Sequence, residues 1–111
     1  MDEEVIPVLR VENAGRAVAW YEQLGFQKEW EHQFEPSFPL FVSIARGSVR
    51  IYLSEHSGDA TPNTLIHLNV RDIDSIAAVL GVTVDENELA GRECDVEDPD
   101  GNRLRIATPR S

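Results

Sequence analysis

The feature that most constrains the fold of this chain is an internal repeat. Val11-Glu12-Asn13 has a counterpart in Val70-Arg71-Asp72, and Leu24-Gly25-Phe26 has one in Leu80-Gly81-Val82. Each pair of motifs brackets a segment with apolar residues at helical spacing, and each bracketed segment lies between segments typical of strands. The chain is therefore predicted to contain two copies of a strand, a helix and three further strands.

In the first copy, the pattern predicts a helix that begins after Asn13, runs to about Leu24 and ends at Gly25. Pro7 confines the first strand to an edge or to a position where no backbone donor is needed. The strands of this copy are expected over 5–11, 26–34, 39–46 and 49–54.

In the second copy, Asp72 is expected to cap a short helix over 73–80 that Gly81 ends. The strands of this copy are expected over 64–70, 82–85, 92–97 and 102–107. Asp98-Pro99-Asp100-Gly101 is expected to form a turn rather than a calcium loop, because Val96 stands where the first acidic ligand is needed. We expect a single α+β domain over 1–111, with one module over about 5–54 and the other over about 64–108.

Side chains in these strands alternate between two faces. One face is apolar and should pack under the helices: Leu9, Val11, Val49, Ile51, Leu53, Ile66, Leu68, Val70, Leu104 and Ile106. The other face is largely polar: Arg10, Arg50, Tyr52, Ser54, Leu65, His67, Asn69, Arg103 and Arg105. If the sheet curves, the polar face lines a groove that can bind a ligand; the alternative is a plain sheet surface that faces solvent.

Composition excludes several classes of function. The 111 residues carry a net charge of −10, which argues against nucleic acid as a partner and fits a cationic ligand, although acidity can simply favour solubility. Met1-Asp2-Glu3-Glu4 has the wrong charge for a signal peptide, and no apolar run is long enough to span a membrane. We therefore expect a cytoplasmic protein without a membrane partner. Cys94 is the only cysteine, and its acidic neighbours argue against a reactive thiol.

Two motifs resemble a known family. Ala19-Trp20-Tyr21-Glu22-Gln23-Leu24-Gly25-Phe26 resembles the helix ending of the glyoxalase/bleomycin-resistance family, part of the vicinal oxygen chelate superfamily. Asp98-Pro99-Asp100-Gly101-Asn102 resembles the family's turn before the last strand. The resemblance implies paired βαβββ modules in a cupped mixed sheet, and a homodimer in which modules of both chains build each cavity.

The catalytic relatives hold a divalent metal with side chains from the first, fourth, fifth and eighth strands, usually His or Gln, Glu, His and Glu. By the strand motifs these positions fall on Ile6, Tyr52, Leu65 and Arg105. None of the four is a usual ligand for such a metal, and a slip of two residues would recover only His67. We therefore predict no metal, no other cofactor and no catalytic residue.

Several side chains are candidates for a binding role. His32 and His67 could act as ligands or bases, but no carboxylate partner is visible for either. Five aromatic residues crowd into the first module, and Phe41 or its neighbours should be core: Trp30, Phe34, Phe38, Phe41 and Tyr52. Bleomycin-resistance proteins stack planar ligands on aromatic groups, which makes Trp30, Phe38 and Tyr52 candidates for lining a cavity.

Four arginines share the polar face, where they can bind an anionic ligand or pair with acidic residues across strands: Arg10, Arg50, Arg103 and Arg105. Arg105 also matches the bleomycin-resistance branch, in which the last-strand glutamate is commonly replaced.

The sequence thus predicts a non-catalytic, bleomycin-resistance-like protein that sequesters an aromatic natural product or antibiotic in a dimer groove. The predicted ligand-binding residues are Trp30, His32, Phe38, Tyr52, His67 and Arg105. One alternative is a metal-dependent lyase, isomerase or dioxygenase with a rearranged site. Another is a ligand sensor or accessory domain.

Overall fold

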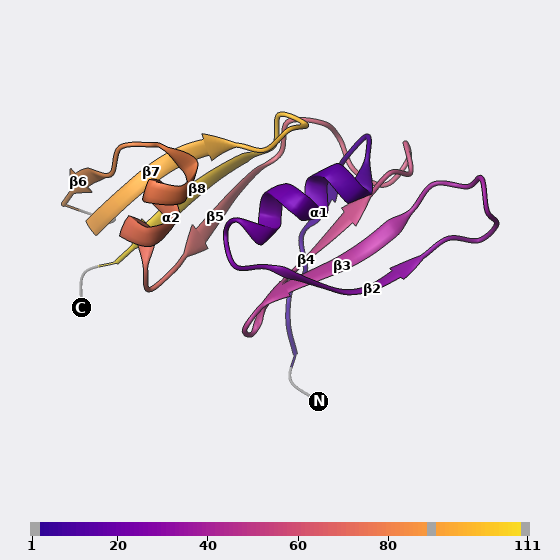
Figure 1. Ribbon diagram of the computed structural model, residues 1–111, viewed down its shortest axis with the longest axis horizontal. Helices are drawn as coiled ribbons and strands as arrows, with labels where there is room; N and C mark the ends of the chain where they lie inside the picture. The colour runs from indigo at the N-terminus through magenta and orange to yellow at the C-terminus, as the bar shows by residue number, and fades with distance from the viewer. Residues whose placement is uncertain (1–2, 89–90, 110–111) are drawn as a thin grey trace.

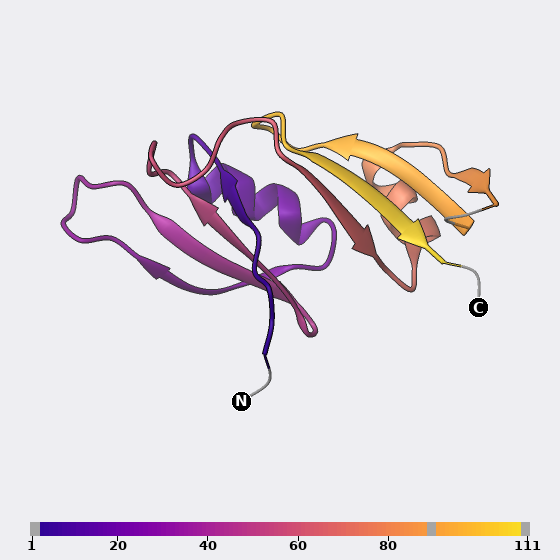
Figure 2. The same ribbon diagram turned by 180° about the vertical axis from the view of Figure 1, so that it is seen from behind.

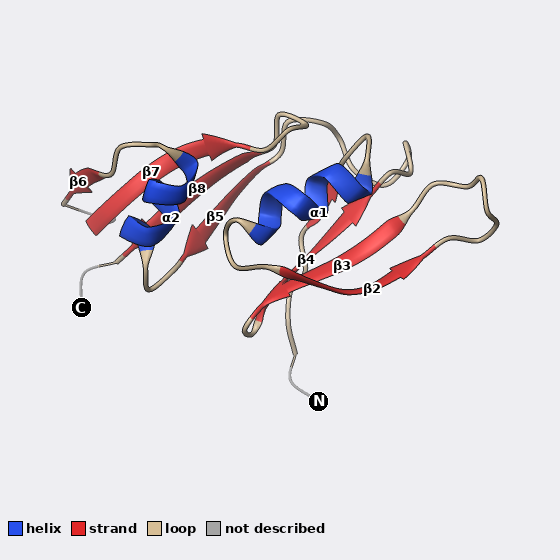
Figure 3. Ribbon diagram, in the orientation of Figure 1, coloured by secondary structure: helices blue, strands red, loops and turns tan. Residues whose placement is uncertain are grey.

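The computed structural model describes residues 3–88 and 91–109, and it confirms the repeat of a strand, a helix and three strands (Figures 1 and 3). The first module contains β1 (Val8–Arg10), α1 (Ala14–Glu22), β2 (Gln27–His32), β3 (Phe41–Arg46) and β4 (Val49–Ser54). The second module contains β5 (Leu65–Asn69), α2 (Ile73–Leu80), β6 (Asp85–Asn87), β7 (Gly91–Glu97) and β8 (Arg103–Thr108).

Each module forms its own mixed sheet of four strands. The strand orders are β1-β4-β3-β2 and β5-β8-β7-β6, and in each sheet the first and last strands of the module pair in parallel. Both helices lie on the same side of the two sheets, as the opposite views of Figures 1 and 2 show. The other side of both sheets carries no helix, and we call it the open face.

The hydrophobic core lies between the helices and the sheets. Leu9, Leu53 and Ile106 are fully buried there, as the strand alternation predicts. Burying a side chain of this size contributes about 1.5–3 kcal/mol, so the alternating pattern fixes which face of each strand points inward. The remaining residues of the predicted apolar face are also buried or packed against this core: Val11, Val49, Ile51, Ile66, Leu68, Val70 and Leu104.

A buried polar network joins the two modules at the turn before β8. The Tyr21 hydroxyl, on α1, donates to Asp98 Oδ2 at 2.8 Å. Asn102 is fully buried, and its side-chain nitrogen donates to both Asp98 Oδ2 and the Arg10 carbonyl, at 3.1 and 3.0 Å. Asn102 Oδ1 accepts from the Thr64 backbone nitrogen at 3.2 Å. The motif at 98–102 therefore holds the two modules together.

The same motif forms the predicted turn. The Gly101 backbone nitrogen donates to the Asp98 carbonyl at 3.1 Å, and Gly101 has a φ of 82°, a region that favours glycine. A Cβ at this position would lie 2.5 Å from Asn63 Oδ1, so a substitution would also have to displace the Asn63 side chain.

Some predicted elements differ from the structure. The first strand is confined to β1, because Pro7 has no backbone donor and contributes only its carbonyl, which accepts from the Tyr52 backbone nitrogen at 3.0 Å. The strand predicted over 82–85 is wrong: β6 instead begins at Asp85. Asp72 precedes α2 as predicted, but its carboxylate pairs with Arg46 of the first module and does not cap the helix.

Candidate functional site

A β-bulge in β2 positions the most prominent feature of the open face. Lys28 pairs with Ile44 and Trp30 pairs with the next residue of β3, Ser43, so Glu29 is an extra residue in the ladder. A bulge of this kind turns two consecutive side chains to the same face. In a regular strand, residues two positions apart lie on the same face. Without the bulge, Trp30 would therefore lie on the same face as Lys28, which faces α1. The bulge places both Glu29 and Trp30 on the open face.

Trp30 lies in a cluster of three aromatic side chains, one from each of three adjacent strands. Its ring is nearly parallel to that of Phe41, with centroids 6.1 Å apart, and lies 5.5 Å from the ring of Tyr52. Phe41 and Tyr52 contact each other with centroids 5.1 Å apart. Trp30 remains 44% exposed, so this cluster offers an aromatic surface to a ligand.

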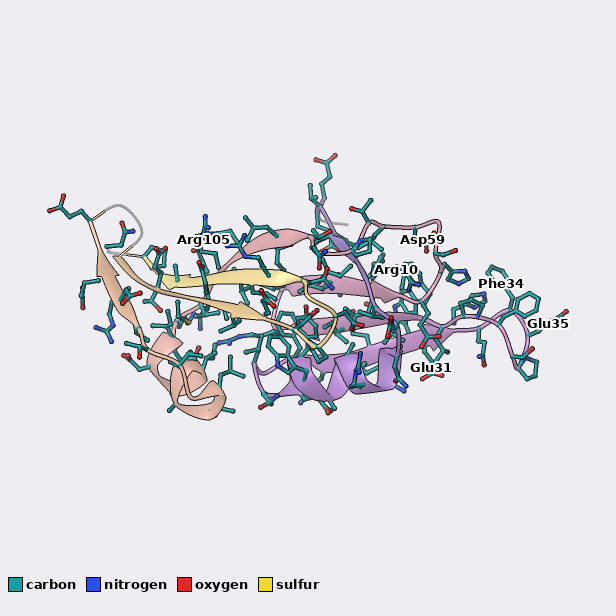
Figure 4. All side chains as sticks on the ribbon, turned by 90° about the horizontal axis from the view of Figure 1, so that it is seen from above. Arg10, Glu31, Phe34, Glu35, Asp59 and Arg105 are labelled. Carbon is teal, nitrogen blue, oxygen red and sulfur yellow. The ribbon has the colours of Figure 1, made fainter. Side chains whose placement is uncertain are left out.

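A hollow of about 360 Å³ adjoins the cluster. Its lining consists of Trp30, His32, Phe34, Phe41, His56 and Asp59. Phe34 forms an outer wall: its ring contacts His32 on one side and His56 on the other, edge to face, with centroids 4.5 and 6.4 Å apart. Phe34 is nevertheless 69% exposed. Figure 4 shows Phe34 and Asp59 towards the same end of the molecule, with Arg105 towards the other end.

On the other side of Trp30, an ion pair covers the strand surface. Arg50 donates from Nε and Nη2 to the two carboxylate oxygens of Glu29, at 2.6 and 2.9 Å, and from Nη1 to Glu4 at 2.6 Å. The Ser43 hydroxyl donates to the same Glu29 at 2.7 Å. The hydrogen bonds from Arg50 first, and then from Ser43, lower the pKa of Glu29 to about 2. Glu29 and Arg50 therefore neutralise each other beside the aromatic cluster.

The structure brings three of the six predicted ligand residues together and leaves three apart. Trp30 and His32 line the hollow, and Tyr52 contacts Trp30. Phe38 lies in the loop between β2 and β3, half exposed, and does not line the hollow. His67 and Arg105 lie on the second sheet, opposite each other on β5 and β8.

The polar-face arginines are largely paired within the chain. Arg103 and Arg105 both contact Asp95 across β7 and β8, with nitrogen–oxygen distances of 3.8 and 3.3 Å. Arg50 pairs with Glu29, and Arg10 donates to the backbone carbonyls of Val11 and Ser54. Cross-strand pairing, the alternative to an anion site, is the arrangement observed for Arg50, Arg103 and Arg105.

Side chains at the family's metal positions do not suit a metal. Leu65 is 46% exposed and apolar, and Arg105 carries a cation that pairs with Asp95. Ile6 and Tyr52 supply no carboxylate or imidazole. In residues 3–88 and 91–109, no group of three or more histidine, cysteine, aspartate and glutamate side chains is arranged to hold an ion. The residues present therefore do not fit the metal of the catalytic relatives.

The predicted ligand residues include only two of the six residues that line the hollow, and Phe34, Phe41, His56 and Asp59 are not among them. Phe41 or its neighbours were expected in the core, and the neighbour Val42 is core, as is Ile44, whereas Phe41 itself faces the open side. His56 and Asp59 lie between the strands predicted over 49–54 and 64–70, in a segment to which the sequence assigned no role. Only their position in the sequence could have indicated a role, because they follow the strand that carries Tyr52.

Cys94 is buried in β7, as a structural cysteine would be. Burial raises the pKa of its thiol, and the nearby Asp95, Asp85 and Glu93 raise it further. Among the residues that the structure describes, no helix is long and apolar enough to cross a membrane.

Two βαβββ modules with a common core and an open face define an α+β protein of paired repeats. The chain belongs to the glyoxalase superfamily, because the family model described as "Glyoxalase superfamily protein" matches residues 1–110. No protein of curated function matches the sequence significantly.

Solved structures with the same fold include both binding proteins and an enzyme. A bleomycin-binding protein complexed with bleomycin is 18% identical, with a TM-score of 0.74 over 98% of this chain and 100% of that one. TnmS3, an antibiotic binding protein from Streptomyces sp. CB03234, is 22% identical, with a TM-score of 0.75 over 99% and 98% of the two chains. Trypanothione-dependent glyoxalase I from Leishmania major is 19% identical, with a TM-score of 0.71 over 98% and 88%. At these identities the similarity shows the fold alone.

Proposed function

We propose that this protein binds a planar aromatic small molecule, of the natural-product or antibiotic kind, and sequesters it without converting it. The observation that carries the proposal is the exposed cluster of Trp30, Phe41 and Tyr52 beside an aromatic hollow of about 360 Å³. Ligand cavities usually measure about 300–1,000 Å³ and are lined mainly by apolar and aromatic groups. A ring stacked on such a cluster gains about 0.5–1.5 kcal/mol beyond the burial of its area.

Two further observations favour binding over catalysis. One protein of the same fold binds bleomycin and TnmS3 is an antibiotic binding protein, which makes this class of ligand a reasonable starting point. A glyoxalase I shares the fold as well, but Ile6, Tyr52, Leu65 and Arg105 do not supply the ligands that a metal-dependent reaction of this family needs.

The proposed binding unit is a homodimer. One copy leaves four large apolar side chains, Trp30, Phe34, Phe38 and Leu65, between 44% and 69% exposed, and in the proposed dimer the second copy covers part of them. In the dimer, the second sheet of one copy lies opposite the first sheet of the other, so that His67 and Arg105 reach the ligand from the partner. Light scattering at micromolar concentration should give about twice the monomer mass. A persistent monomer would contradict the dimer and would mean that one chain alone forms the binding site.

Fluorescence of Trp30 tests the proposal directly. The chain has two tryptophans, so Trp30 is the only one in a Trp20→Phe background. Titration with bleomycin and with anionic aromatic compounds should quench this signal at submillimolar concentration. Calorimetry should then show that Trp30→Ala weakens binding about tenfold, the equivalent of ~1.4 kcal/mol, whereas Trp20→Phe does not.

Failure can take two forms. If no compound quenches Trp30 below millimolar concentration, the sequestration proposal loses its main support. If a compound binds equally well to folded Trp30→Ala, the ligand site lies elsewhere on the protein.

A further inference from the structure

A tight turn after β4 fixes one carboxylate at the edge of the hollow. The Asp59 backbone nitrogen donates to the His56 carbonyl at 3.2 Å, which brings the two side chains to the same rim. Ser54, which is fully buried, secures both ends of this turn: its hydroxyl accepts from the His56 backbone nitrogen at 3.1 Å and donates to Asp59 Oδ2 at 2.6 Å. Asp59 is therefore held by one oxygen.

The other oxygen of that carboxylate is free among the described residues. Asp59 forms no ion pair with any of them, although Arg10 lies on the neighbouring strand. The Arg10 guanidinium instead donates to the backbone carbonyls of Val11 and Ser54. Asp59 is also the only aspartate, glutamate, lysine or arginine among the residues that line the hollow.

Three of the other five lining residues suit the same sign of ligand charge, and the remaining two are His32 and His56. The rings of Trp30, Phe34 and Phe41 line the hollow, and the faces of aromatic rings attract cations. A carboxylate with one free oxygen can accept a charge-assisted hydrogen bond from an ammonium group. Both features favour a positively charged group and oppose a carboxylate in the ligand.

We propose that this hollow selects aromatic ligands that carry an amine or another cationic group beside the ring, with Asp59 as the residue that determines this specificity. The inference rests on the proposed function, since it names the ligand class of the same site. In the complex, the aromatic ring stacks on the cluster of Trp30, Phe41 and Tyr52, and the cationic group bonds to the free oxygen of Asp59.

Three naphthalenes, each with one small polar substituent that is cationic, neutral or anionic, test the inference: naphthylmethylammonium, naphthylmethanol and naphthoate. Calorimetry on the wild-type protein at neutral pH should show the ammonium compound binding about tenfold more tightly than the alcohol, with naphthoate weakest. Asp59→Asn should reduce this preference to about twofold or less, while the affinity for the alcohol stays unchanged. Asp59→Glu keeps the charge and should keep most of the preference.

Glu35→Gln is the matched control. Glu35 follows Phe34 in the loop between β2 and β3, does not line the hollow, and its replacement changes the net charge by the same amount (Figure 4). If Glu35→Gln lowers the cation preference as much as Asp59→Asn, the preference comes from the overall field of the protein and the inference is wrong.

Other outcomes separate the two proposals. Equal binding of all three naphthalenes, or a preference that persists in Asp59→Asn with wild-type melting behaviour, overturns the role of Asp59 and leaves aromatic binding intact. If none of the three binds and bleomycin does not quench Trp30, both proposals fail together. If Asp59→Asn does not fold, loss of the preference in folded Asp59→Glu contradicts the inference.

Discussion

Tyr21→Phe should destabilise the protein by loosening the junction between its modules. The substitution removes one hydroxyl, whose bond to Asp98 Oδ2 is 2.8 Å long and fully buried. Asp98 would keep its bonds from the Asp100 and Asn102 backbone nitrogens and from the Asn102 side chain, so its charge stays partly satisfied. A hydrogen bond to a charged group contributes about 1.5–3 kcal/mol, so we expect a loss of about 2 kcal/mol.

Urea denaturation followed by circular dichroism measures this loss. The midpoint should fall at unchanged slope, and the melting temperature should drop by about 8 °C for a chain of this size. Tyr52→Phe is the matched control, because no described group bonds to its hydroxyl on the open face, and it should cost less than about 0.5 kcal/mol. If Tyr21→Phe lowers the free energy of unfolding as little as Tyr52→Phe does, the hydrogen bond from Tyr21 contributes little to the junction between the modules.

The same hydroxyl should make the protein sensitive to alkali. Burial, and then the charge and hydrogen bond of Asp98, raise the pKa of Tyr21 well above its ordinary value of 10.0. The unfolded chain therefore loses this proton first, so the stabilisation is fully present below pH 10 and declines as the pH rises further, by up to about 1.4 kcal/mol per unit. Stability above pH 10 should fall less steeply in Tyr21→Phe than in the wild type; parallel curves would refute the assignment.

Four other predictions concern separate parts of the molecule. Gly101→Ala should cost about 1–3 kcal/mol in urea denaturation, whereas Gly58→Ala, with open space around it, should be nearly neutral. The Cys94 thiol, buried and with a raised pKa, should react with a chromogenic thiol reagent only as fast as the protein unfolds; rapid labelling of native protein would contradict its burial. The Glu29 carboxylate should titrate near pH 2 by NMR, against an ordinary 4.5, so its pairing with Arg50 is present above pH 4.5 and is lost as the pH falls through 2; in Arg50→Gln the midpoint should rise. Elemental analysis of protein purified without chelators should find no stoichiometric divalent metal, because Ile6, Tyr52, Leu65 and Arg105 offer no suitable ligands, and one tightly bound ion per chain would overturn the binding proposal.

The fold was largely predictable because burial has a simple signature in this chain. Alternation along β4 and β8 separates Ile51, Leu53 and Ile106 from the polar face, and the structure buries all three. Gly81 ends α2 with a positive φ value, as expected from its position, and Gly25 also has a positive φ value, although it follows the last residue of α1 by three positions. Each of these patterns lies within one segment of the sequence, so it can be recognised without knowing which strands pair with which.

The site was less predictable because it depends on relations between strands. The position of Trp30 follows from a change of register between β2 and β3, which no pattern within β2 reveals. Likewise, Phe41 and Val42 are adjacent in the sequence and both are apolar. Only the pairing of β3 with β4, which places Phe41 beside Ser54, shows that Phe41 lies on the open face. The hollow also needs His56 and Asp59, which a turn brings back over the sheet.

The extra residue in β2 also shows how a sheet surface can acquire chemistry by insertion. A ladder without Glu29 would still pair Lys28 with Ile44 and Trp30 with Ser43, so every aromatic side chain would keep its place. Glu29 thus adds a carboxylate to this surface without displacing an aromatic side chain, and this carboxylate is the counter-ion of Arg50. Changes in chain length of a single residue, in addition to point substitutions, therefore offer a route by which the ligand preference of this sheet can evolve or be engineered.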